Sequence, residues 1–149
     1  MSTKYAPLPT IGDIVWCHFP QEMGVPGPKP RPALVRAVST ARNLVQVAYG
    51  TSKKTGSLYP GEFVLDPSDG GFADSGLEVR TKFDVGNLVT LPFDDTWFAP
   101  SPLLKPGTPA PKMGSLHVSY LTAAIKARET YKDYQAKKAR EALRLANDK

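Results

Sequence analysis

The sequence contains few of the residues that metal sites and disulfides need. Its 149 residues include one cysteine, Cys17, and two histidines, His18 and His117. One cysteine forms no internal disulfide and no Cys-based zinc site, and two histidines are too few for a histidine-rich metal centre. We therefore expect no metal and no cofactor. The scarcity of cysteine also fits a protein of the reducing cytoplasm.

Long apolar runs are missing as well. No segment approaches the roughly 20 apolar residues that cross a bilayer, and the N-terminal MSTKYAPLPT lacks the apolar region of a secretory signal. We therefore expect no membrane contact. The sequence also lacks a GK[ST] phosphate loop, a G-x-S-x-G elbow, an H-E-x-x-H helix and a dinucleotide fingerprint. The enzyme classes built on those motifs are excluded.

What the sequence does contain is typical of one small all-β domain with an appendage. All 15 prolines and 12 glycines fall within the first 115 residues, where they separate short β-branched and aromatic runs. Five of these runs have the length of strands: residues 13–19, 33–38, 44–49, 62–65 and 87–92. Residues 39–43 between the second and third runs predict a hairpin.

From Ser119 the composition changes, because no proline or glycine occurs through Lys149 and strong helix formers dominate. We expect one long helix at residues 119–149. It carries a stripe, spaced by four and three residues, that can pack on the β domain or on a partner: Tyr120, Ala124, Ala127, Tyr131 and Tyr134. The predicted organisation is a β-barrel domain at 1–99, a proline-rich linker or strap at 100–118, and a basic helix at 119–149.

The net charge of +5 is concentrated in the predicted helix. Residues 126–149 hold 8 basic and 4 acidic groups, whereas the other 125 residues hold 11 and 10. An anion-binding tail and a solvated, lysine-rich helix both account for this excess.

The most specific motif is GDIVWCHF at residues 12–19, followed by a proline-rich loop and KPRPALV at 29–35. This pair resembles the N-terminal signature of the MazF/PemK family of toxin endoribonucleases, in which a G-D-(I/V)-(V/I)-W strand leads through a loop to an R-P motif. The likeness continues, in the family's order, in VAYGTSK at 47–53 and TKFDVGNLVTLP at 81–92. It covers roughly the first 95 residues.

The resemblance implies a mainly β fold, an SH3-like small barrel of the MazF/PemK/CcdB type, followed here by a long C-terminal helix. It also implies a homodimer, single-stranded RNA as the substrate, and an antitoxin protein that blocks the RNA-binding face. The family cleaves RNA without a metal, by attack of the 2′-hydroxyl on its neighbouring phosphate. Such cleavage needs a proton acceptor, a proton donor, and positive charge for the developing phosphorane.

Four residues are the catalytic candidates that the resemblance implies. Arg31 matches the arginine of the R-P motif, and its guanidinium can bind two phosphate oxygens at once; the alternative is a structural pair with Asp13. Thr51 matches the family's hydroxyl position, although Thr-Ser after glycine is also an ordinary turn. His18 stands at a strand end where a proton-transfer or a structural role is open. Glu22 lies in the first loop, where its alignment needs a gap.

Six further residues are candidates for RNA binding. Ser52 completes the hydroxyl pair, and the lysines that follow it add charge where an RNA backbone would run. The later segment departs from the family pattern and offers further phosphate contacts and one carboxylate, which is a structural cap or a proton acceptor. The complete set is Ser52, Lys53, Lys54, Arg80, Lys82 and Asp84.

Aromatic residues divide into two groups. We expect Trp16 in the core of the barrel. Trp97 and Phe98 are adjacent, so both cannot point inward from one strand, and we expect an interface there.

The leading prediction is a toxin-type, metal-independent endoribonuclease. The alternative is a catalytically inactive MazF-like binding module that inhibits or binds a host protein or a nucleic acid. A groove that joins Arg31, Thr51 and a proton acceptor favours the nuclease, whereas a groove with Arg31 alone favours the binding module. A third, structural role through the Tyr120–Tyr134 stripe predicts that loss of the helix abolishes function.

Overall fold

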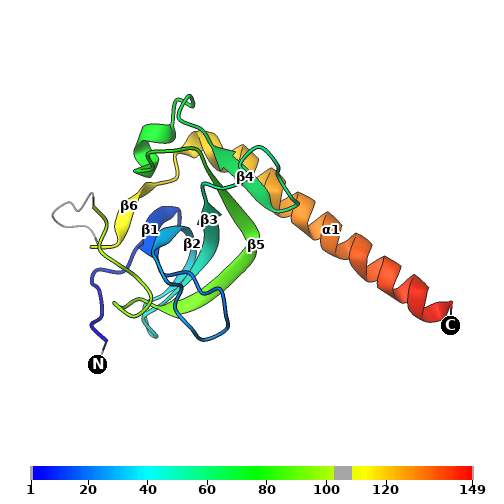
Figure 1. Cartoon of the computed structure of the whole chain (residues 1–149), viewed down its shortest axis with the longest axis horizontal. Helices are drawn as coiled ribbons and strands as arrows, with labels where there is room; N and C mark the ends of the chain where they lie inside the picture. The colour runs from blue at the N-terminus through cyan, green and yellow to red at the C-terminus, as the bar shows by residue number, and fades with distance from the viewer. Residues whose placement is uncertain (1, 103–108, 149) are drawn as a thin grey trace.

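The structure is a computed structural model that describes residues 2–102 and 109–148. In these residues, antiparallel strands form one sheet in the order β4-β5-β3-β2-β1-β6. The sheet curls into a half-barrel, and one long helix leaves it near β4 (Figure 1). The strands are β1 (Asp13–Cys17), β2 (Arg31–Ser39), β3 (Leu44–Thr51), β4 (Glu62–Leu65), β5 (Thr81–Pro92) and β6 (Lys112–Ser115). The helices are η1 (Phe72–Ser75), η2 (Val118–Tyr120) and α1 (Leu121–Asn147).

The prediction of a mainly β chain with a long C-terminal helix is confirmed. The expected hairpin joins β2 and β3, and Asn43 turns there with a positive φ of 54°. The strand expected at residues 13–19 is shorter, because β1 ends at Cys17 and the next backbone N–H donates to the Trp97 carbonyl. The strand expected at 87–92 is longer, since β5 already begins at Thr81.

Strand β6 was not predicted. Its residues, KMGS, lie in the segment that we expected to be a linker or strap, and they contain no β-branched residue. β6 nevertheless pairs antiparallel with β1 and forms one edge of the sheet. Residues 103–108 of the proline-rich segment lie outside the described residues.

Both faces of the sheet are covered by apolar side chains, because successive residues of a strand point to opposite faces. One cluster contains Ile14, Phe83 and the first part of α1, and the other contains Val15 and Phe98. Phe98 is only 1% exposed, so our prediction that Trp97 and Phe98 form an interface is wrong for Phe98.

Helix α1 packs on the sheet only through its first half. Ala124 and Ala127 of α1, with Tyr120 of the preceding η2, are buried in the cluster that contains Phe83, and Tyr131 contacts the chain at Gly86. Every described residue after Tyr131 is exposed. At 1.5 Å per residue, residues 132–148 extend over roughly 25 Å. Figure 1 shows this end of the helix projecting away from the sheet.

Candidate functional site

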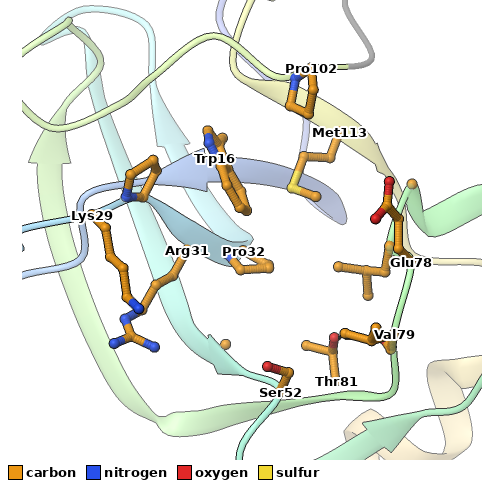
Figure 2. Close-up of a pocket in the computed structure, with 14 residues that line it drawn as sticks. Trp16, Lys29, Arg31, Pro32, Ser52, Glu78, Val79, Thr81, Pro102 and Met113 are labelled. Atoms are coloured by element: carbon orange, nitrogen blue, oxygen red, sulfur yellow. Dashed lines mark hydrogen bonds between the residues drawn. The ribbon is translucent and has the colours of Figure 1, made fainter.

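A cavity of about 600 Å³ opens on the face of the sheet that α1 also covers. Figure 2 shows its walls. They come from β1, from the start of β2, from the end of β3, from the segment that links η1 to β5, and from β6. Its volume lies within the range of small-molecule and cofactor sites.

The floor of the cavity depends on close backbone packing at Gly50. A Cβ atom at this position would lie 2.3 Å from the Pro32 carbonyl oxygen and 2.7 Å from the Phe83 ring. Both approaches are shorter than real contacts of a Cβ atom. A glycine is therefore required where β3 passes β2, and its absent side chain leaves room for the cavity.

Cations stand on one side of the cavity. Arg31 is the first residue of β2 and is half-buried, and Lys29 precedes it on the exposed loop. Both side chains line the cavity, and in the view of Figure 2 both extend in the same direction, away from Trp16. Within residues 2–102 and 109–148, neither side chain forms a hydrogen bond or an ion pair. The proposed pairing of Arg31 with Asp13 is wrong, because Asp13 accepts from Lys112 at 3.2 Å.

A carboxylate stands across the cavity from these cations. Glu78 is exposed, lines the cavity, and has no hydrogen-bond or ion-pair partner in the described part of the chain. Figure 2 shows it on the opposite wall from Arg31, near Met113. Sequence reasoning missed Glu78, because only the turn at η1, which packs on β6, brings it to this wall.

Trp16 forms part of the apolar wall. Its backbone N–H donates to the Pro111 carbonyl at 2.8 Å, and its own carbonyl accepts from Ala99 at 3.0 Å. The residue is half-buried and lines the cavity, so the prediction that it is a core residue is wrong in part. An indole in the wall of a cavity that cations also line is a suitable surface for stacking a base.

The two hydroxyls of the predicted pair point to different places. Ser52 lines the cavity and Gly50 does too, whereas Thr51 between them does not. Thr51 is buried, and its hydroxyl accepts a hydrogen bond from the backbone N–H of Lys53 at 3.1 Å. The structure therefore brings Ser52, but not Thr51, to Arg31. The lysines that follow, Lys53 and Lys54, are exposed on the adjoining loop.

Lys82 and Arg80 are both held by carboxylates. Lys82 is 4% exposed and donates to Glu62 at 3.0 Å and to the Ser57 carbonyl at 3.1 Å. Arg80 is exposed and pairs with Asp66. Hydrogen bonds from Ser68 and then from Arg80 lower the pKa of Asp66 to about 2. The structure thus assigns both cations internal partners rather than places in the cavity.

Asp84 lies in β5 and is absent from the cavity lining. Its Oδ1 accepts a hydrogen bond from the Gly86 N–H at 2.8 Å. Burial raises the pKa of its carboxyl, and the hydrogen bond from Gly86 opposes that shift. The geometry is that of a local cap.

His18 and Glu22 belong to the loop between β1 and β2 and do not line the cavity. The Nδ1–H of His18 donates to the Gly27 carbonyl at 3.0 Å, and the Gly27 N–H donates back to the His18 carbonyl. His18 therefore fastens the two ends of the loop together. Glu22 is exposed, and its carbonyl accepts from Val25 in a tight turn.

No group of three or more His, Cys, Asp or Glu residues in the described ranges is arranged to hold a metal ion. Burial raises the pKa of the Cys17 thiol, which keeps it protonated and unreactive. No helix of the described residues is long and apolar enough to cross a membrane.

No family model matches this chain, and no curated protein matches it.

Proposed function

We propose that this chain is a metal-independent endoribonuclease of the MazF/PemK type that cleaves single-stranded RNA in the cavity at Arg31. The proposal rests on two charged groups that line the same cavity and have no partner in the described residues, Arg31 on one wall and Glu78 on the other. Cationic groups without internal partners are free to bind a phosphodiester, and a free carboxylate is available to accept a proton. The half-barrel fold is compatible with the SH3-like barrel of this family.

The chemistry divides among three groups. Arg31 binds two nonbridging oxygens of the scissile phosphate and stabilises the charge that develops on the phosphorane. Glu78 accepts the proton of the 2′-hydroxyl as its oxygen attacks phosphorus. The bond from phosphorus to the 5′-oxygen then breaks, and that oxygen takes a proton from the Lys29 ammonium or from water. The products are a 2′,3′-cyclic phosphate and a 5′-hydroxyl, so the reaction needs no cofactor.

Arginine substitutions on one strand test this assignment. Arg31→Ala should lower the cleavage rate of a single-stranded RNA by roughly 10²–10³-fold, which is the loss expected when a donor to a developing oxyanion is removed. Arg36→Ala is the matched control, because Arg36 is also a half-buried residue of β2 but lies outside the cavity. Equal rates for the two variants would contradict the proposal.

A binding module is the second candidate, and a specific observation favours it. Three of the four predicted catalytic residues, Thr51, His18 and Glu22, lie outside the cavity that holds Arg31. Under this candidate the cavity binds RNA without cutting it. Retention of RNA by the wild-type protein with no cleavage, and loss of that retention in Arg31→Ala, would favour the binding module.

Partners and location follow from the proposal rather than from the fold. A MazF/PemK-type nuclease acts in the cytoplasm as a homodimer and is held inactive by an antitoxin protein. Sedimentation of the purified chain, with and without a co-expressed antitoxin, tests both associations.

A further inference from the structure

A second groove, of about 410 Å³, lies between the edge strand β4 and helix α1. Leu58, Tyr59 and Pro60 form its loop side, and Lys126 and Thr130 form its helix side. Tyr59 is 67% exposed. The backbone N–H of Tyr59 donates to Glu62 at 2.7 Å, and the Lys82 ammonium lies 5.8 Å from the centroid of the Tyr59 ring.

The groove continues into a basic face of the helix. At 100° per residue, four cations fall within about 60° of arc: Lys126, Lys137, Arg140 and Arg144. Asp133 also lies on this face, and Arg144 pairs with Glu141 at 3.8 Å. Lys126, Lys137 and Arg140 have no ion-pair partner within the described ranges. Within this arc the face carries four cations and one acidic residue, and three of the cations lie on the projecting part of α1.

One loop connects this groove with the cavity at Arg31. Ser52 lines the cavity, and Leu58 lines the groove. Six residues span at most about 21 Å of extended chain, so the two sites are close neighbours. Lys53 and Lys54 are exposed on the loop between them. Hydroxyl, ammonium and aromatic groups therefore follow one another from the cavity to the helix.

We propose that the single strand bound at Arg31 continues over residues 52–61 into the groove at Tyr59 and along the basic face of α1. This inference rests on the proposed function. An exposed aromatic ring that leads to a row of cations has the composition of a site for unpaired RNA, in which bases stack and phosphates meet positive charge. The projecting helix thereby lengthens the RNA-binding surface beyond the site of cleavage.

The test measures binding to 2′-O-methyl single-stranded RNA, which has no free 2′-hydroxyl and so cannot be cut by the proposed reaction. Labelled strands of about 4 and about 14 nucleotides are compared by fluorescence anisotropy over a range of salt concentrations. The longer strand should bind at least about tenfold more tightly. The double variant Lys126→Glu, Arg140→Glu should abolish that gain, and the slope of log K against log salt should fall by roughly 0.7 for each phosphate that the variant no longer binds.

Lys132→Glu is the matched control. Lys132 is an exposed lysine of the same helix, about 120° around the axis from Lys126, and its substitution should preserve the length dependence. Tyr59→Leu keeps an apolar side chain but removes the stacking surface, and should weaken only the longer strand's binding by about tenfold.

The outcomes separate the two proposals. Equal affinity for both lengths, with short-strand binding abolished in Arg31→Ala, would overturn the extended path and leave the proposed function standing. If Lys132→Glu lowered the affinity for the longer strand as much as the double variant does, the path would also be overturned, because a positive charge anywhere on the helix would then be sufficient for binding. If neither the short nor the long strand bound, both the extended path and the proposed function would be overturned.

Discussion

The buried ion pair with Glu62 indicates that Lys82 is a structural cation rather than an RNA-binding one. The Lys82 ammonium lies 3.0 Å from Glu62 Oε1, and the two side chains are 5% and 10% exposed. The same Glu62 oxygen accepts the Tyr59 N–H. We predict that Lys82→Met, which keeps the aliphatic stem and removes the charge, destabilises the fold rather than acting on RNA directly.

The magnitude follows from burial. Removing one partner of a buried ion pair costs about 3–5 kcal/mol, because the other charge is left without compensation, whereas an exposed pair contributes about 0–1 kcal/mol. For a chain of 149 residues, a loss of about 3 kcal/mol lowers Tm by about 6–12 °C. The desolvated carboxylate of Glu62 supplies most of that loss.

Urea and thermal unfolding of four proteins measure this effect: wild type, Lys82→Met, Glu62→Gln and the double variant. The Glu62→Gln substitution keeps an acceptor for the Tyr59 N–H while removing the charge. The double variant should therefore recover part of the stability lost in Lys82→Met. A loss below about 1 kcal/mol, or weaker RNA binding by a fully stable Lys82→Met, would contradict a structural role for Lys82.

Two further predictions concern single residues. Asp84→Asn should stabilise the fold at pH 7, because the pKa of Asp84 is raised in the folded state. The contribution of Asp84 to stability is therefore full below the unfolded pKa of 3.8 and is lost as the pH rises through the folded pKa. Urea unfolding should show a smaller stability gain of the variant over wild type at pH 4 than at pH 7, and a larger gain at pH 4 would contradict the prediction. Gly76→Ala should destabilise by about 2 kcal/mol or more, since Gly76 has a φ of +72° and an added Cβ would lie 2.0 Å from the Met113 carbonyl oxygen; Gly56→Ala, where nothing lies within 4 Å, is the control, and equal Tm values for the two variants would show that the turn at η1 does not depend on this close approach.

The strands that sequence reasoning found are those whose residues carry the signal themselves. Residues 44–49 include Val45, Val47 and Tyr49, which favour strands, and they form most of β3. β6 could not be found in this way, because KMGS has no strand propensity and is held by pairing with β1 from about a hundred residues away. A short segment of sequence carries no signal for pairing with a strand so far away in the chain.

The site was predicted in part. Two of the predicted site residues, Arg31 and Ser52, line the same cavity, whereas Thr51 does not line it. The period of two in a strand already implies this result, because adjacent residues point to opposite faces. Glu78 carries no such signal, since it sits in an irregular turn whose position depends on how η1 packs against β6.

Chemical mapping of RNA ends, after incubation of the purified chain with a long single-stranded RNA in excess EDTA, decides whether the chain is a metal-independent endoribonuclease. We predict discrete cuts that carry a 2′,3′-cyclic or 3′-phosphate and a 5′-hydroxyl, and their loss in Arg31→Ala but not in Arg36→Ala. Intact RNA from the folded wild-type protein, or cuts that persist in Arg31→Ala, would contradict it.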